Sequence, residues 1–151
     1  MKHLCLAVIA LCLLFIAQGS IAQDRDFGLG VIIGEPTGFS AKLWTSPFNA
    51  FDFGLGWTNG GNRVDFHMDY LWHSFDAIHS TERFPLYYGI GGRINTGAGN
   101  NSSLAIRGVL GIAWLPRATP IDVFFEIVPL LQITQSTGFA IDAAIGARYY
   151  F

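Results

Sequence analysis

Apolar side chains alternate with polar or small ones along most of this chain. Successive side chains of a β-strand point to opposite faces, so this alternation is typical of strands with two different faces. Turn-favouring residues, such as Asn59-Gly60-Gly61-Asn62, separate most of the segments. The pattern predicts an all-β chain of eight strands, at residues 27–33, 39–45, 51–57, 64–72, 86–94, 104–114, 121–127 and 139–151.

The two faces of these segments differ in charge. One face is apolar and carries no charged residue; in the first segment it consists of Phe27, Leu29, Val31 and Ile33. The opposite face carries His67 and every charged side chain of the segments, namely Lys42, Asp52, Asp65, Asp69, Arg93, Arg107, Asp122, Glu126, Asp142 and Arg148. One face is therefore suited to an apolar medium and the other to ion pairing.

Two barrel architectures would produce this pattern. A soluble, lipocalin-like ligand-binding barrel turns its apolar face inward, whereas an outer-membrane barrel turns it toward lipid. The interior of an eight-stranded barrel is just wide enough for side chains. The apolar face is too bulky for that space, while the other face is rich in glycine and alanine. We therefore expect an eight-stranded antiparallel up-and-down transmembrane β-barrel, with the soluble barrel as an alternative.

Charge and aromatic residues support the same orientation. Only 13% of the residues are charged, whereas soluble surfaces usually carry about 25–35%. Arginine and carboxylate side chains can pair in a confined lumen, where an unpaired charge is costly. Aromatic residues lie near segment ends on the apolar face, as the two interfaces of a membrane require: Trp57, Tyr70, Trp72, Trp114, Tyr149 and Phe151.

The first residues have the features of a secretory signal peptide. A short charged start precedes the apolar run 4–17, and small residues at Ser20 and Ala22 fit a cleavage site. We predict cleavage after Ala22 and a barrel domain over 23–151. Cys5 and Cys12 both lie in the removed segment, so no disulfide is expected in the barrel. The formal charge of −2 does not suggest a nucleic-acid partner.

The last segment carries the most specific resemblance to a known group. Ile141, Ala143, Ile145, Ala147, Tyr149 and Phe151 alternate toward a final phenylalanine. In this the chain resembles small outer-membrane β-barrels similar to the transmembrane domain of OmpA. Gly34-Glu-Pro-Thr-Gly38 with Lys42-Leu-Trp44, and 86–93, resemble such barrels from spirochaetes and other diderm bacteria.

The resemblance implies a location and partners. It implies insertion into the bacterial outer membrane, contact with its lipid, and recognition of Tyr149 and Phe151 by the barrel-insertion machinery. An even strand count places both termini on one side, expected to be the periplasm. The chain departs from the OmpA pattern in its connections, because 34–38, 58–63, 95–103 and 128–138 on the outer side are short, and 73–85 on the periplasmic side is the longest. Any host or surface ligand is left open.

The polar face carries residues that bear on catalysis, metal binding and conduction. Asp65, His67 and Asp69 with Ser40 could be drawn as a nucleophile–base–acid set, but we expect His67 to join an ion-pair network with Arg93 and Arg107. A pair of His67 and His73 offers too few ligands for a metal site. The inner face also carries Trp44, Tyr87, Phe124 and Tyr150, which favours a filled lumen over a pore. We expect a structural or surface-interaction barrel without catalysis or cofactor, with a narrow low-conductance pore as an alternative.

Overall fold

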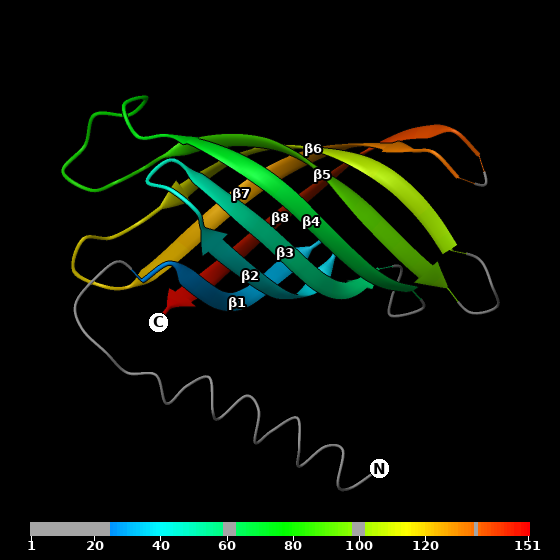
Figure 1. The fold of residues 1–151 in the computed structure, drawn as a ribbon, viewed down its shortest axis with the longest axis horizontal. Coiled ribbons are helices and arrows are strands. Elements are labelled where there is room, and N and C mark those ends of the chain that lie inside the picture. The colour runs from blue at the N-terminus through cyan, green and yellow to red at the C-terminus, as the bar shows by residue number, and fades with distance from the viewer. Residues whose placement is uncertain (1–24, 59–62, 98–101, 135) are drawn as a thin grey trace, which may run out of the picture.

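The chain forms a closed antiparallel barrel of eight strands in up-and-down order (Figure 1). The computed structural model describes residues 25–58, 63–97, 102–134 and 136–151, so the predicted signal peptide lies outside the described residues. The strands are β1 (Phe27–Gly34), β2 (Thr37–Trp44), β3 (Asn49–Thr58), β4 (Arg63–Ser74), β5 (Leu86–Gly97), β6 (Ser102–Trp114), β7 (Ile121–Gln132) and β8 (Gly138–Tyr150). The predicted eight-stranded all-β barrel is confirmed.

Each strand pairs with its neighbours in the chain, and the first strand pairs with the last. The β1–β8 pairing runs from Gly28 opposite Tyr150 to Gly34 opposite Ala144, and it closes the barrel. The part of the chain that the structure describes contains no helix long and apolar enough to cross a membrane.

Several predicted strand ends were wrong by a few residues. β7 continues to Gln132 instead of ending at residue 127, with Pro129 paired opposite Ile141. β4 continues to Ser74, so the longest connection covers 75–85 and not 73–85. Thr37 and Gly38 belong to β2, which leaves only Glu35 and Pro36 between β1 and β2. The predicted turn at 59–62 lies outside the described residues.

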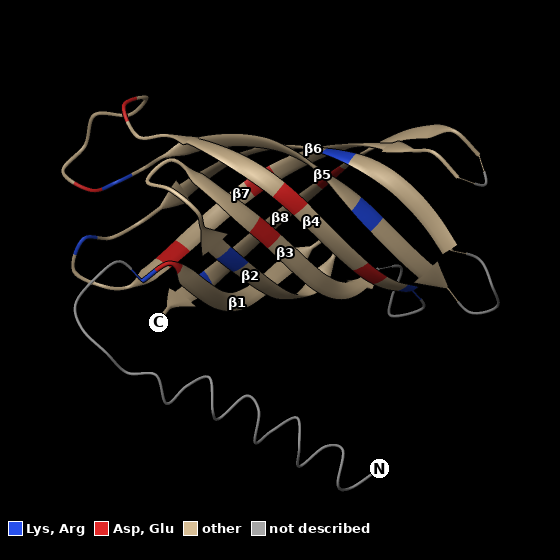
Figure 2. Cartoon of the chain, viewed as in Figure 1, with Lys and Arg blue, Asp and Glu red and all other residues tan. Residues whose placement is uncertain are grey.

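Alternation of the strands places charged residues inside the barrel and apolar residues outside it. Along β4, Asp65, His67 and Asp69 are buried, whereas Phe66 and Met68 are exposed. Figure 2 shows the charged residues of the strands as separate blue and red segments spread along the barrel wall. Glycines make room for large inner side chains, because a Cβ on Gly111 would overlap the ring of Tyr87.

The two ends of the barrel differ. We call the end where β1 begins and β8 ends the terminal end; it carries the connections 45–48, 75–85 and 115–120. Outward aromatic rings cluster here, with Tyr70 and Trp72 at 5.0 Å and Trp72 and Tyr88 at 5.7 Å between ring centroids. Trp57 is the only one of the six predicted interface aromatics near the opposite, far end, so these residues mark the two ends unequally.

Candidate functional site

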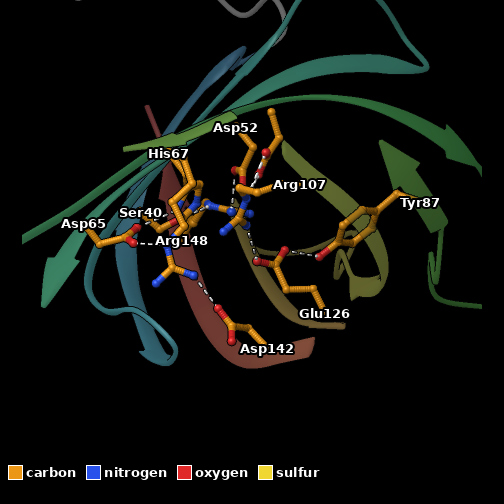
Figure 3. A network of polar contacts seen from close by, with 11 residues as sticks. Ser40, Asp52, Asp65, His67, Tyr87, Arg107, Glu126, Asp142 and Arg148 are labelled. Carbon is orange, nitrogen blue, oxygen red and sulfur yellow. Dashed lines mark hydrogen bonds and ion pairs between the residues drawn. The ribbon is translucent and has the colours of Figure 1, made fainter. Parts of the chain in front are cut away.

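The barrel interior contains the charged residues singled out in the sequence. Lys42, Asp52, Asp65, His67, Asp69, Arg107, Asp122, Glu126 and Arg148 are at most 3% exposed. Arg93 is also buried, and Asp142 is half-buried. Because seven different strands contribute these side chains, their contacts cross the lumen and join strands that are not neighbours in the sheet (Figure 3).

Arg148 of β8 is the most connected of these groups. Its Nη2 donates to Asp52 Oδ1 at 2.5 Å, its Nη1 to Asp122 Oδ2 at 3.3 Å, and its Nε to Ser40 Oγ at 2.8 Å. The guanidinium carbon also lies 3.8 Å from the centroid of the Phe124 ring. One arginine thus links β8 to β2, β3 and β7, with hydrogen bonds that compensate for its burial.

Arg107 of β6 occupies the middle of the lumen. Its Nε lies 3.0 and 3.1 Å from the two carboxylate oxygens of Asp69 on β4, two strands away in the sheet. Its Nη2 lies 3.8 Å from Glu126 Oε1. The other oxygen of Glu126 accepts a hydrogen bond from the Tyr87 hydroxyl at 3.1 Å. This group therefore ties β4, β5, β6 and β7 together.

Arg93 of β5 forms a third centre, nearer the far end. Its Nε donates to Asp65 Oδ2, and its Nη1 donates to Asp142 Oδ2 at 2.5 Å. Asn95 donates to the same Asp65 oxygen at 3.5 Å. The half-buried position of Asp142 makes this the most accessible part of the network.

Lys42 lies at the terminal end of the lumen, in an aromatic enclosure. Its ammonium group is 2.8 Å from His73 Nε2, and it lies over the rings of Trp44 and Tyr87 at 4.6 and 5.2 Å from their centroids. His73 Nδ1 faces the Phe48 carbonyl at 3.2 Å. If Nδ1 carries the ring proton, Nε2 is free to accept a hydrogen bond from Lys42.

His67 joins the ion-pair network only through Asp65, which also binds Arg93. Its Nδ1 lies 3.5 Å from Asp65 Oδ1, but neither ring nitrogen has a hydrogen-bond partner among the described residues. Ser40, the serine considered as a nucleophile, accepts its hydrogen bond from Arg148 and not from His67. The structure therefore does not assemble the nucleophile–base pair that the sequence allowed.

Sequence reasoning missed the role of His73 and two hydroxyl groups. His73 was assigned to a connection, whereas it lies on the inner face of β4 beside Lys42. The alternation of Asp65, His67 and Asp69 continues through Leu71 to His73, and this signal could have found it. Ser40 and Tyr150 complete the network, with the Tyr150 hydroxyl donating to Asp122 Oδ2 at 2.7 Å.

A hollow of about 890 Å³ lies at the terminal end. Three arginines line it, Arg25, Arg83 and Arg117, together with the connections at 45–47 and 115–120. Trp44 and Tyr150 also line it, and since both lie on inner faces of strands, they form its boundary toward the packed lumen. Deeper in the lumen the charged side chains contact one another, and these contacts link the strands.

The chain matches one protein family over nearly its whole length. The family described as "Protein of unknown function (DUF3996)" matches residues 19–148, which cover all eight strands apart from the last two residues of β8. Neither a curated protein nor a solved structure matches the chain.

Proposed function

The chain belongs to this family of proteins of unknown function, and we propose that it is an integral outer-membrane β-barrel with a structural or surface-interaction role and without catalysis. One observation carries the proposal: the barrel is apolar outside and charged inside. Large apolar side chains are exposed on all eight strands, among them Leu29, Phe39, Leu55, Phe66, Ile90, Leu110, Ile127 and Ile145. A band of this kind around a barrel is suited to contact with lipid.

The orientation of the side chains argues against the soluble alternative. A lipocalin-like barrel would need an apolar interior for its ligand and a charged exterior for water. Here Asp52, Asp122 and Arg148 have at most 3% of their surface exposed, while Phe39 is 58% exposed. Burying those charges while exposing the apolar side chains to water would be unfavourable on both faces.

The packing of the lumen argues against the alternative of a narrow pore. Arg148 extends from β8 to Asp52 on β3, and Arg107 extends from β6 to Asp69 on β4, so two arginines from different parts of the wall reach the paired positions 52 and 69 in the interior. Phe124 and Leu71 are also buried in the lumen. Opening a water path would require these ion pairs to break or rearrange, which is costly in a confined interior.

Detergent dependence and ion flux test the proposal together. We expect the purified barrel to stay monodisperse only in detergent, to migrate differently on gels before and after heating, and to give silent bilayers. A chain that is soluble and monomeric without detergent would refute the membrane assignment. Steady ion flux that changes in an Arg107→Ala variant, but not in an Arg25→Ala control at the terminal end, would replace the structural role by a pore.

We further propose that both ends of the barrel domain face the periplasm and that the insertion machinery recognises β8. Phe151 follows β8, and its amide donates to the Phe27 carbonyl at 3.0 Å. Its exposed ring lies 5.2 Å from that of Tyr149. These two aromatic side chains therefore stand on the outer surface at the β1–β8 junction, where a partner strand or protein could contact them during closure.

The Phe151→Asp variant tests this assembly role. We expect export to continue while the fraction of heat-modifiable barrel in the outer membrane falls several-fold, because a charge replaces an aromatic contact at the membrane interface. Phe48→Asp is a control at an exposed aromatic residue of the same end, in the 45–48 connection. Equal losses in both variants, or no loss in Phe151→Asp, would contradict the proposed role.

A further inference from the structure

We propose that the lumen contains a binding site for one divalent transition-metal ion, formed by Asp52, His67 and Asp69. The inference concerns the barrel interior and holds whether or not the barrel lies in a membrane. It rests on the convergence of three possible ligands, on an unsatisfied buried histidine and on the charge balance of the lumen.

The strand register brings the three residues together. Asp52 of β3 lies directly opposite Asp69 of β4, and Gly54 lies opposite His67. One potential ligand atom from each of Asp52, His67 and Asp69 lies within 4.8 Å of the other two, and all three residues are buried. Ligand atoms about 2.0–2.2 Å from a tetrahedral zinc ion lie about 3.3–3.6 Å from one another, so side-chain rotations that bring the most distant pair about 1 Å closer are needed to bind an ion.

His67 is the observation that points to a ligand. Its side chain is fully buried, and neither nitrogen has a hydrogen-bond partner among the described residues. Buried polar groups without partners are rare, and each requires an explanation. Gly54 contributes no side chain on the inner face of β3, and the imidazole occupies that space.

Asp65 is placed to orient the histidine. Its Oδ1 lies 3.5 Å from His67 Nδ1, and this oxygen also has no hydrogen-bond partner among the described residues. Metal-bound histidines usually donate their second ring N–H to a carboxylate or a carbonyl. We therefore assign Nδ1 to Asp65 and Nε2 to the metal, which makes Asp65 a positioning residue.

Arg107 and Arg148 are compatible with this arrangement. Arg148 contacts Oδ1 of Asp52, and Arg107 Nε lies beside both oxygens of Asp69. An ionised carboxylate has about four acceptor positions, so each aspartate can bind an ion while keeping its arginine. Such outer contacts commonly fix the orientation of metal-binding carboxylates.

The charge of the lumen favours a bound cation. Six carboxylates, those of Asp52, Asp65, Asp69, Asp122, Glu126 and Asp142, face the cationic side chains of Lys42, Arg93, Arg107 and Arg148, and Arg63, half-buried on the same face of β4, adds a fifth cation. With neutral histidines the interior has a formal charge of −1. Carboxylates therefore outnumber cations, and a bound cation offsets this excess.

The donor set indicates the class of metal. One imidazole nitrogen with carboxylate oxygens suits Zn²⁺ and similar first-row ions better than Mg²⁺ or Ca²⁺, which prefer oxygen ligands alone. The ligands are enclosed in the lumen, so we expect the ion to be bound during folding and to exchange slowly afterwards. The site is suited to joining β3 and β4 and not to exposing a metal to substrate.

Zinc binding by the folded, full-length barrel tests the proposal. The chain is refolded in detergent with and without Zn²⁺, desalted, and analysed by elemental mass spectrometry and zinc K-edge absorption. We expect about one zinc per chain, with one imidazole and oxygen ligands in the first shell. Less than one-tenth of a zinc per folded chain, or a first shell without imidazole, would overturn the proposal.

Matched variants locate the site. His67→Gln should lose bound zinc, whereas His79→Gln, at an exposed histidine of 75–85, and Asp142→Asn, at a half-buried lumen carboxylate, should keep it. Asp65→Asn should weaken the affinity about 10–100-fold, as loss of an outer contact does. Gel heat-modifiability verifies folding of each variant. Zinc retained by folded His67→Gln refutes the assignment. If His67→Gln does not fold, the presence or absence of an imidazole ligand in the zinc K-edge absorption of the unmodified protein decides whether His67 binds the ion.

Discussion

The two faces of β4 show how differently one strand can be used. Phe66 and Met68 leave nearly half of their surface exposed, while Asp65, His67 and Asp69, between and beside them, are at most 1% exposed. In a soluble protein the two sets would exchange places. Inside the barrel, other side chains replace water as partners of the charged groups, because buried charges must be paired and hydrogen-bonded.

On the inner face, single arginines pair with more than one partner. Arg148 contacts Asp52, Asp122 and Ser40, and Arg107 contacts Asp69 and Glu126. The outer face carries apolar side chains, which need no such partners and contact one another through neighbouring aromatic rings. We therefore expect substitutions on the two faces to act through different physical terms.

The largest effect is expected from Arg148→Met. Methionine retains bulk but leaves Asp52 and Asp122 as buried carboxylates without their shared partner, and such a loss typically costs about 3–5 kcal/mol. The free energy of unfolding, measured by urea titration of the barrel in lipid vesicles, should fall by that amount. Arg25→Met, at the mouth of the barrel, is the control and should change it little.

A rescue variant separates lost charge pairing from lost packing. Adding Asp52→Asn and Asp122→Asn to Arg148→Met removes the unpaired charges, and we expect it to recover much of the lost stability. A triple variant as unstable as Arg148→Met would show that packing against Phe124, and not the ion pairs, accounts for the effect.

The outer face should respond to charge by a smaller amount. Phe66→Arg introduces a cation on the exposed side of β4, directly beside Asp65 and His67 in the sequence. In a bilayer a cation at mid-depth costs about 2–4 kcal/mol, and the cost falls near the interfaces. The measurement is unfolding in vesicles, with Val64→Arg, nearer the strand end, as the comparison. Equal stability of Phe66→Arg and the unmodified barrel in lipid would place this face outside the membrane.

The fold could be predicted from sequence because two-residue alternation is a local property. Within each segment, such as 64–72, the alternation shows which residues share a face. The ten charged residues then identify the equivalent face in the different segments. Strand ends were harder, because turn-favouring residues do not always end a strand. The seventh segment was predicted to end at residue 127, but β7 continues to Gln132 and includes Pro129, opposite Ile141. The β7–β8 pairing continues through this residue, whereas the β6–β7 pairing skips it, between Arg107 opposite Leu130 and Leu110 opposite Ile127. The missing N–H thus interrupts the ladder on one side only.

The contacts within the lumen could not be predicted from alternation. Which carboxylate meets which arginine depends on the stagger between strands and on side-chain reach across the barrel. Arg93 faces His67 in the β4–β5 register, yet it binds Asp65 and, across the lumen, Asp142 on β8. The sequence places His67 on the charged face. Only the three-dimensional arrangement shows that both nitrogens of His67 lack hydrogen-bond partners among the described residues, and that Lys42 hydrogen-bonds to His73.

The smallest expected effect compares one glycine on each face. A Cβ on Gly54 of β3 would overlap the His67 ring, whereas a Cβ on Gly92 of β5 would approach its nearest neighbour, the Ala105 carbonyl oxygen, only to 4.0 Å. Gly54→Ala should therefore cost about 1–3 kcal/mol through overpacking. Gly92→Ala should raise the free energy of unfolding by about 0.4–1 kcal/mol, because alanine restricts the unfolded chain. Urea unfolding in vesicles measures both, and equal losses would mean that the crowding is not confined to the inner face.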